Sequence, residues 1–290
     1  MELGVILPRE LDLAVAAAHA EDVGLDSVWH GDHLATGSPS LDPTVALAVA
    51  AAVTSRIRVG VSVFVPAIRP LALAAKQVAS LQVVAGGRLV LGIGSGGGAA
   101  QFAAAGVPYR ERGRRTDTAL RLLPDLLAGR PVFLPDERAE VRLTPAVPRP
   151  PFWVGNASEV AIRRAATLGD GWFPSVIEAD ELAAGVRRLT ELAGGGGLGG
   201  SGGRPVVAIG ATGMLGDGGP TAAEIGARLS AAYGHAPERA AKIPITGSPA
   251  QAAERIAEYT RAGATHLVIG FAAGDWRRQC ELLAEAGRLL

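Results

Sequence analysis

The chain has 290 residues with 28 basic and 28 acidic side chains, so its formal net charge at pH 7 is zero. A nucleic-acid-binding protein or a basic membrane-surface segment would show a basic excess, so this balance removes the electrostatic case for both classes. The content of 48% hydrophobic and 19% charged residues is typical of a globular protein and not of a disordered one.

Short β-branched runs alternate with longer helical patterns along the chain. Eight runs predict strands, at residues 3–7, 25–29, 57–65, 89–93, 152–154, 171–173, 206–209 and 266–270. Helical patterns lie at 9–23, 43–55, 71–84, 112–127, 158–168, 183–192, 222–232, 249–262 and 276–289. Asp42 before Pro43 is typical of a helix start, and Pro124 predicts a bend or cap near the end of its helix.

Strands that alternate with helices predict a parallel sheet with right-handed crossovers. Eight such units favour a closed (β/α)8 barrel, a TIM barrel, that forms a single domain over residues 1–290. An open doubly wound sheet is the alternative. The glycine-rich stretch 194–203 is expected to be a flexible surface connector.

Other features exclude several kinds of site. Cys280 is the single cysteine, so no disulfide within the chain and no cysteine metal site is expected. No His, Asp or Glu cluster has metal-ligand spacing, so no metal is predicted. The N-terminus lacks the pattern of a signal peptide, and no apolar run is long enough to span a bilayer. We therefore expect a soluble cytoplasmic protein with neither a membrane nor a nucleic-acid partner.

Polar residues that follow the strands are the candidates for chemistry, because the active site of such a barrel lies at the C-terminal ends of its strands. Asp32 and His33 form the only acid–histidine pair at a predicted strand end. They indicate a cofactor contact together with an imidazole that transfers protons. The alternative is that the two residues only stabilise the loop in which they lie. Tryptophans in or at strands, at positions 29, 153 and 172, are expected to pack in the core or at the barrel rim.

Two further segments could contact a ligand. Residues 154–158 precede a helix whose first N–H groups could bind a phosphate, although an ordinary turn capped by Asn156 or Ser158 is equally consistent. The run 94–98 could make room for a flat ligand, or it could be a mobile loop of biased composition. It does not match the dinucleotide-binding fingerprint.

Four blocks of the sequence resemble the luciferase-like monooxygenase superfamily, specifically its coenzyme F420-dependent (deazaflavin) branch. The blocks are AEDVGLDSVWHGDHL at 20–34, the stretch from TSRIRVG to LGIGSG at 54–96, GVPYRERGRRTDTALRLL at 106–123 and PPFWVGNASEVAIRRAATLGDGWFPS at 150–175. Residues 247–270 are similar to the closing helix and strand of the family. The resemblance covers most of the first 175 residues.

The resemblance implies a barrel that holds a deazaflavin or flavin at the strand C-termini. In relatives, the residue matching Asp32 contacts the ring system and the one matching His33 has an acid–base role. Those matching Ser62 and Val63 form a non-prolyl cis peptide behind the ring, and Ser95 and Gly96 match a loop beside it. The backbone matching Val154, Gly155, Asn156 and Ala157 holds the cofactor phosphate.

The sequence also departs from the family pattern. Sugar-phosphate dehydrogenase relatives carry a catalytic glutamate at the position of Gly97, so the resemblance does not carry that substrate or that general acid over to this chain. Gly155-Asn156 replaces the usual Gly-Gly at the phosphate turn, and His30 adds a second imidazole near Asp32. Arg69, within the second block, merits a separate test.

These observations lead to three functional hypotheses. The first is an F420-dependent oxidoreductase that exchanges a hydride with a small organic substrate. The reaction would be the reduction of an activated C=C or C=N bond or the oxidation of an alcohol. His33 would supply or remove the proton. The second is an FMN-dependent monooxygenase. The third is a cofactor-holding or degenerate barrel without turnover. A homodimer is a further implication of the resemblance.

Overall fold

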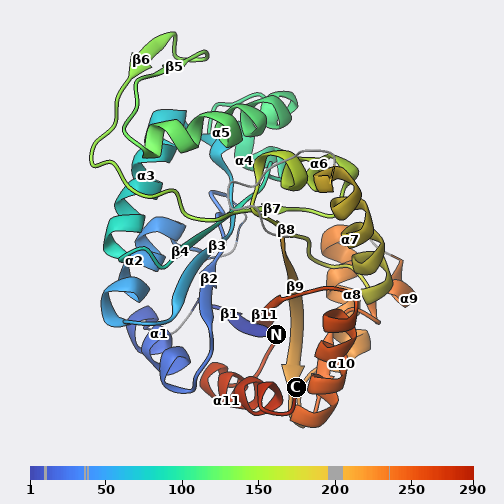
Figure 1. Ribbon diagram of the computed structural model, residues 1–290. Helices are drawn as coiled ribbons and strands as arrows, with labels where there is room; N and C mark the ends of the chain where they lie inside the picture. Colours follow the sequence, from blue (N-terminus) through green and yellow to red (C-terminus); the bar gives the residue numbers. More distant parts are fainter. Residues whose placement is uncertain (10–11, 36, 38, 195–204, 235) are drawn as a thin grey trace.

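Eight parallel strands close into a barrel in the computed structural model, which describes residues 1–290 apart from 10–11, 36, 38, 195–204 and 235. The order around the barrel is β9, β11, β1, β2, β3, β4, β7, β8 and back to β9 (Figure 1). The strands are β1 (Glu2–Ile6), β2 (Ser27–His30), β3 (Arg58–Phe64), β4 (Leu89–Ile93), β7 (Phe152–Gly155), β8 (Gly171–Phe173), β9 (Val206–Leu215) and β11 (His266–Phe271). The predicted (β/α)8 barrel is confirmed, and the pairing of β8 with β9 excludes an open sheet.

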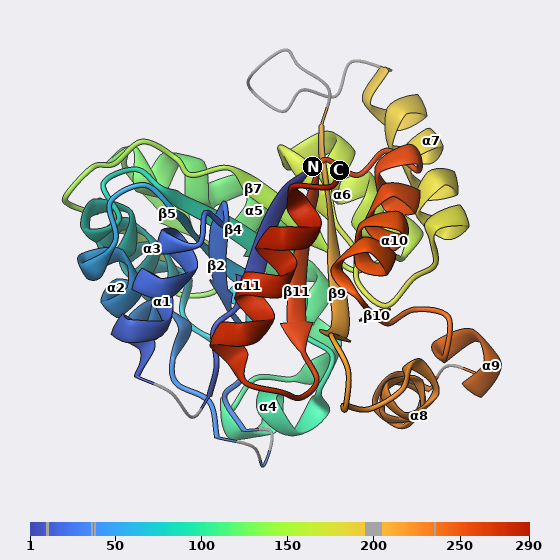
Figure 2. The same cartoon turned by 90° about the horizontal axis from the view of Figure 1, so that it is seen from below.

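Helices surround the barrel on its outer side (Figures 1 and 2). They are α1 (Leu13–Asp22), α2 (Pro43–Val53), α3 (Leu71–Val84), α4 (Ala99–Ala104), α5 (Arg112–Leu127), α6 (Glu159–Leu168), α7 (Ala179–Gly194), α8 (Ala222–Tyr233), α9 (Pro237–Ala240), α10 (Pro249–Arg261) and α11 (Trp276–Gly287), with two 3-10 turns, η1 (Pro66–Ile68) and η2 (Tyr109–Glu111). In Figure 2, α4, α8 and α9 lie at the end of the barrel toward which the strand arrows point, and both termini lie at the other end.

Aromatic side chains fill the inside of the barrel. The rings of Trp29 and Trp153 stack with centroids 5.4 Å apart, and the Phe173 ring meets Trp29 edge-on at 5.2 Å. Gly60 lies against the Trp29 ring, where any Cβ would clash. Trp172 instead packs in the main core cluster, which also takes in residues of the surrounding helices. The predicted packing roles of the three tryptophans are confirmed, and the interior is a packed core, not a channel.

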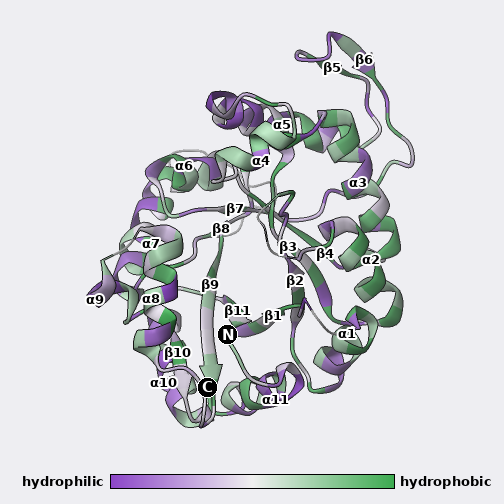
Figure 3. Cartoon of the chain, turned by 180° about the vertical axis from the view of Figure 1, so that it is seen from behind, coloured by the Kyte–Doolittle hydropathy of each residue, from purple (hydrophilic) through white to green (hydrophobic). Residues whose placement is uncertain are grey.

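Small side chains let the first helices lie close to one another and to the barrel. Ala16 and Ala17 on α1 and Ala46 and Ala50 on α2 are all almost completely buried. Figure 3 shows α2 hydrophobic along most of its length, in keeping with its alanine- and valine-rich sequence. Its predicted start is confirmed, because the Asp42 carboxylate accepts a hydrogen bond from the Thr44 N–H at 2.8 Å.

Several helix ends differ from the prediction. Helix α1 begins at Leu13 and not at residue 9, because the Asp12 carboxylate caps it by accepting from the Ala14 N–H at 2.9 Å. Helix α7 extends beyond its predicted bounds at both ends, whereas α5 has the predicted bounds, with Pro124 in its last turn. Of the predicted glycine connector, residues 195–203 lie outside the described residues.

Short elements were not predicted. They are helices α4 and α9 and three strands of three residues each, β5 (Val132–Leu134), β6 (Ala139–Val141) and β10 (Ile245–Gly247). Strands β5 and β6 form an antiparallel hairpin apart from the barrel, whereas β10 pairs with the C-terminal half of β9. Segments this short contain too few residues to show a periodicity. Within the described part of the chain, no helix combines the length and apolar character required to cross a membrane.

Candidate functional site

The loops after β2, β3, β4 and β7 meet at the C-terminal mouth of the barrel. The Asp32 carboxylate accepts a hydrogen bond from the Val65 N–H at 2.8 Å, which joins the first two loops. The Gly94 N–H donates to the Phe64 carbonyl at 2.9 Å, which joins the next pair. Parallel strands bring these segments together because all their C-terminal ends lie at the same end of the barrel.

The Val63 side chain rests on a surface of glycines. The peptide bond between Ser62 and Val63 is cis, as the resemblance implied. A Cβ on Gly94 would clash with Val63, and one on Gly155 would lie 2.9 Å from Val63 Cγ1. Gly94 therefore makes room for Val63, and the predicted contact of the 94–98 loop with a flat ligand stays a prediction. The Ser62 hydroxyl is buried without a hydrogen-bond partner, so a polar group is available at this point.

Asp32 is held by two protein groups and is only 3% exposed. One carboxylate oxygen accepts from the Val65 N–H, and the other pairs with the Arg69 guanidinium at 2.7 Å. The predicted cofactor contact of Asp32 stays a prediction. What the structure adds is that Asp32 fixes Val65, the first residue after β3, and the Ser62–Val63 bond lies just before it in the last part of that strand.

The His33 imidazole folds back over Gly31, so that a Cβ at residue 31 would lie 2.6 Å from His33 Nε2. Partial burial lowers the pKa of His33, the charge of Arg9 lowers it further, and Asp32 opposes both. His33 is thus neutral near pH 7 while part of its ring faces solvent.

His30 is the second imidazole of this loop and is more deeply buried. Burial lowers its pKa, with His33 and Arg9 adding to the effect. Its Nε2 lies 3.2 Å from the Leu41 carbonyl, so it ties the loop to the segment before α2.

A polar cavity of about 280 Å³ opens beside the mouth, between the loop after β4 and the start of α6. It is lined by Ser95, Gly96, Gly97, Tyr109, Arg112, Gly155, Asn156, Ser158, Ala161 and Arg164. The structure therefore brings together four of the predicted cofactor-binding residues. Val154 and Ala157 do not line the cavity, and the Val154 side chain packs in the core cluster.

The turn before α6 and the start of the helix form one side of this cavity. Asn156 has a φ of 88°, and its side-chain oxygen accepts from the Ser158 N–H at 2.9 Å. The Ser158 hydroxyl caps the helix by accepting from the Ala161 N–H at 3.4 Å. Of the two candidate caps, Ser158 is therefore the N-cap of α6, and Asn156 instead stabilises the turn before it. An N-cap of this kind leaves other N–H groups of the first turn available to an anion.

Arginine side chains give the cavity its charge. Arg164 is neutralised by Asp117, whose carboxylate lies 2.7 Å from Arg164 Nε. Arg112 lies over the Tyr109 ring at 4.0 Å and donates to the Tyr109 carbonyl, and among the described residues no carboxylate forms an ion pair with it. A cation without a counter-ion at a helix N-terminus is suited to bind an anion.

Sequence reasoning missed Tyr109, Arg112 and Arg164. Tyr109 and Arg112 lie well beyond the end of β4, and Arg164 lies on α6, so only the folding of α5 and α6 around the cavity brings the three to the mouth. The block that contains Tyr109 and Arg112 was part of the family resemblance, which is the one signal that pointed to it.

A second cavity, of about 550 Å³, lies between the end of β9 and the starts of α10 and α11. Asp275 at its edge caps α11 by accepting from the Arg278 N–H at 2.8 Å, and Arg278 pairs with Glu281. None of the predicted site residues lines it. Across the described residues, no group of three or more His, Cys, Asp or Glu side chains could hold a metal ion.

Comparison with known proteins agrees with this geometry. The sequence profile of the family described as luciferase-like monooxygenase matches residues 9–212. The chain belongs to this family. The predicted resemblance is thus confirmed, and F420-dependent enzymes are among the named relatives that match.

Curated relatives match over parts of their length. An F420-dependent glucose-6-phosphate dehydrogenase of Kineococcus radiotolerans is 35% identical over 173 residues, which are 55% of this chain and 51% of the relative. An F420-dependent hydroxymycolic acid dehydrogenase of Mycobacterium tuberculosis is 33% identical over 187 residues, 59% of this chain and 51% of the relative. The chain spans about half the length of the curated relatives it matches.

Solved structures share the fold. An F420-dependent secondary alcohol dehydrogenase bound to an F420–acetone adduct has a TM-score of 0.83 at 17% identity, covering 98% of this chain and 97% of the other. The oxygenating constituent of 3,6-diketocamphane monooxygenase from Pseudomonas putida, in complex with FMN, has a TM-score of 0.75 at 18% identity, with 98% and 96% covered. Identities this low support the fold alone.

Proposed function

We propose that this protein is an F420-dependent oxidoreductase that transfers a hydride between the deazaflavin and a small organic substrate. The observation that carries the proposal is the polar cavity at the mouth, where Arg112 has no acidic partner among the described residues and lies near the N-terminus of α6. The cavity adjoins the glycines that support Val63, so an anionic tail and a flat ring could be held side by side. The named F420-dependent relatives support the choice of cofactor.

The residues at the mouth fit such a cofactor. Arg112 and the backbone of Gly155, Asn156 and Ser158 would hold its phosphate. The Ser62–Val63 segment and the loop of Ser95 and Gly96 would lie against its ring, and the unpartnered Ser62 hydroxyl is a polar group that a heteroaromatic ring can satisfy. When bound, the deazaflavin supplies the hydride chemistry that no side chain of the protein can supply.

His33 is the group we assign to proton transfer. Its lowered pKa keeps the imidazole neutral near pH 7, and a neutral imidazole accepts protons. This protonation state favours the oxidation of an alcohol, in which the hydroxyl proton passes to His33. Reduction of an activated C=C or C=N bond would instead require His33, or water bound to it, to supply a proton.

Gly97 provides no carboxylate to share this task. A Cβ at residue 97 would meet nothing within 4 Å, so the space beside it is open. Its carbonyl accepts a hydrogen bond from the Tyr109 hydroxyl at 3.0 Å. We infer that the substrate differs from that of the relatives which carry a glutamate at this position.

Replacement of Arg112 tests the anion site. We expect Arg112→Gln to weaken F420 binding by about tenfold or more, since it removes a charge-assisted contact, about 1.4 kcal/mol. Fluorescence titration of the purified variants measures this. Arg110→Gln is the matched control, because Arg110 is exposed in the same turn and does not line the cavity. Equal affinities of both variants and the wild type would reject the assignment.

A turnover assay tests the reaction class. Oxidised F420 with a panel of primary and secondary alcohols, and reduced F420 with activated enones and imines, would be followed by the absorbance of the oxidised cofactor. We expect turnover with at least one alcohol. Binding of F420 without turnover in either direction would instead support the non-catalytic barrel.

FMN-dependent monooxygenation is the second candidate, because the family and the diketocamphane monooxygenase share this fold. It requires reduced FMN and dioxygen. Oxygen uptake that depends on reduced FMN and on an added organic substrate would favour it over the first proposal.

A further inference from the structure

Arg69 is a nearly buried cation at the mouth that has no role in the proposed reaction. Its side chain is 12% exposed, its Nη2 lies 2.7 Å from Asp32 Oδ1, and its Cζ lies 4.5 Å above the Phe64 ring. Its Nη1 is buried and has no hydrogen-bond partner. A buried carboxylate is strongly destabilising unless a cation neutralises it. Arg69 is the cation that does so for Asp32.

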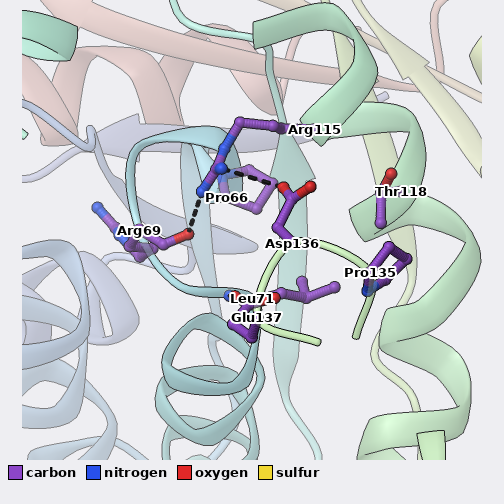
Figure 4. A pocket seen from close by; sticks show the side chains of 8 residues that line it. All are labelled: Pro66, Arg69, Leu71, Arg115, Thr118, Pro135, Asp136 and Glu137. Atoms are coloured by element: carbon purple, nitrogen blue, oxygen red, sulfur yellow. Dashed lines mark hydrogen bonds and ion pairs between the residues drawn. The ribbon is translucent and has the colours of Figure 1, made fainter. Parts of the chain in front are cut away.

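The main chain of Arg69 is held by a second arginine from α5. Arg115 donates from Nε to the Ala67 carbonyl at 2.8 Å and from Nη2 to the Arg69 carbonyl at 3.3 Å. Asp136, in the turn of the β5–β6 hairpin, accepts from Arg115 Nη1 at 3.1 Å (Figure 4). Figure 4 shows the Arg115 guanidinium between the Arg69 carbonyl and the Asp136 carboxylate.

The hairpin turn also fixes the start of α3. The Glu137 carboxylate accepts from the Leu71 N–H at 3.1 Å, two residues after Arg69. Both sides of the 67–71 segment are thus tied to elements outside the barrel. The backbone from which the Arg69 side chain reaches Asp32 is therefore fixed on both sides.

We propose that Arg69 is a positioning residue that sets the orientation and the net charge of Asp32, and through Asp32 governs His33 and the cofactor site. Asp32 precedes His33 directly in the chain, and its two oxygens are divided between Arg69 and the Val65 N–H. Loss of Arg69 would leave the buried Asp32 carboxylate with the Val65 N–H as its remaining partner of the two, and with a negative charge that no cation compensates. The part of this inference that concerns the cofactor rests on the proposed function.

His33 reports the charge of Asp32 without any cofactor. The charged groups that act on His33 are Arg9, which lowers its pKa, and Asp32, which raises it, while His30 is a neighbouring imidazole. Removal of Arg69 exposes the full charge of Asp32 to His33. The pKa of His33 should therefore rise.

The experiment is an NMR titration of the histidine rings in the cofactor-free protein, with the His33 signals assigned by their loss in His33→Gln. In Arg69→Gln we expect the His33 midpoint to rise by about half a pH unit or more. Arg69→Lys should restore it close to the wild-type value. Arg121→Gln, an exposed arginine on α5, is the matched control and should not change it.

An unchanged midpoint in folded Arg69→Gln would overturn the proposal. Should that variant fail to fold, Asp32→Asn is compared with the double variant Asp32→Asn/Arg69→Gln, in which no buried charge is left unpaired. The proposal requires these two to have the same His33 midpoint, because Arg69 acts through Asp32. A clear difference between them would overturn it.

Cofactor affinity is measured on the same variants. We expect Arg69→Gln to bind F420 at least tenfold more weakly and Arg69→Lys to recover most of the affinity. If the wild-type protein binds no F420, the proposed function fails, whereas the titration of His33 still decides the role of Arg69.

Discussion

Three residues at the mouth depend on one another. Asp32 is held by Arg69 and the Val65 N–H, and it stands next to a partly buried His33 whose ring covers Gly31. The arrangement keeps a charged carboxylate inside the protein and a neutral imidazole at its edge. Two predictions follow at this scale, one for the acid and one for the histidine.

Asp32→Ala should weaken F420 binding at least tenfold, about 1.4 kcal/mol, because it frees the segment after β3 and leaves Arg69 without its counter-ion. Fluorescence titration measures the affinity, and thermal unfolding reports any loss of stability. Asp22→Ala is a suitable control, since Asp22 is exposed near the end of α1. Unchanged affinity in folded Asp32→Ala would reject the assignment.

The pH dependence of alcohol oxidation should follow His33. Because the reaction needs the neutral imidazole and the pKa of His33 lies below its usual 6.5, kcat/KM should be constant at neutral pH. It should fall only as the pH drops through that lowered pKa. His33→Gln should lose most of the activity and this acid limb with it. An identical acid limb in wild type and variant would show that another group is responsible.

Site residues close to the C-terminal end of a strand could be predicted from the sequence, because the barrel places every strand end at one mouth. Asp32, Ser62 and Gly155 are of this kind. Arg112 and Arg164 could not, since their position depends on how α5 and α6 pack, and nothing in their local sequence separates them from other arginines. Arg69 attracted attention through its place after the third strand and within the family block, and its pairing with Asp32 emerged from the structure.

Elements differ in how clearly their sequence specifies them. All eight barrel strands were predicted because each is a short apolar run of β-branched or aromatic residues between helical patterns. The β5–β6 hairpin was not, although its turn fixes the segment that carries Arg69. The hairpin is stabilised by tertiary contacts of Asp136 and Glu137. These contacts cannot be predicted from the local sequence pattern of two strands of three residues each.

Glu21 illustrates how one side chain links two elements. At the end of α1, its carboxylate accepts hydrogen bonds from the N–H groups of Ser55, Arg56 and Ile57, which lead into β3. Burial alone would raise the pKa of Glu21, but these hydrogen bonds outweigh it and lower the pKa to about 2.

Because the folded pKa is lowered from 4.5, the stabilisation by Glu21 is complete above pH 4.5 and is lost as the pH falls toward 2. Glu21→Gln should reduce the free energy of unfolding at pH 7 by about 1 kcal/mol, a low value because the carboxylate is only partly buried. It should also flatten the fall in stability between pH 4.5 and 2. Urea unfolding measures both, with the exposed Glu140→Gln as control. Equal stabilities of the two variants at pH 7 would contradict this role.

At the scale of the whole molecule, a chain with zero net charge contains a local site for an anion. The site combines the neutral backbone at the start of α6 with Arg112, which has no ion-pair partner among the described residues. A balanced net charge over the chain is therefore compatible with a local site for a phosphate-bearing cofactor. The homodimer implied by the resemblance stays a prediction, and the exposed valines of α2, at positions 45, 49 and 53, form an apolar stripe that it could cover.

The central claim is that the barrel mouth holds the deazaflavin cofactor. Titration of the purified protein with F420 and, separately, with FMN, followed by fluorescence, tests it most directly. We predict saturable F420 binding in preference to FMN. Tight FMN binding with no F420 binding would contradict the claim, and binding of neither would favour a barrel without a cofactor.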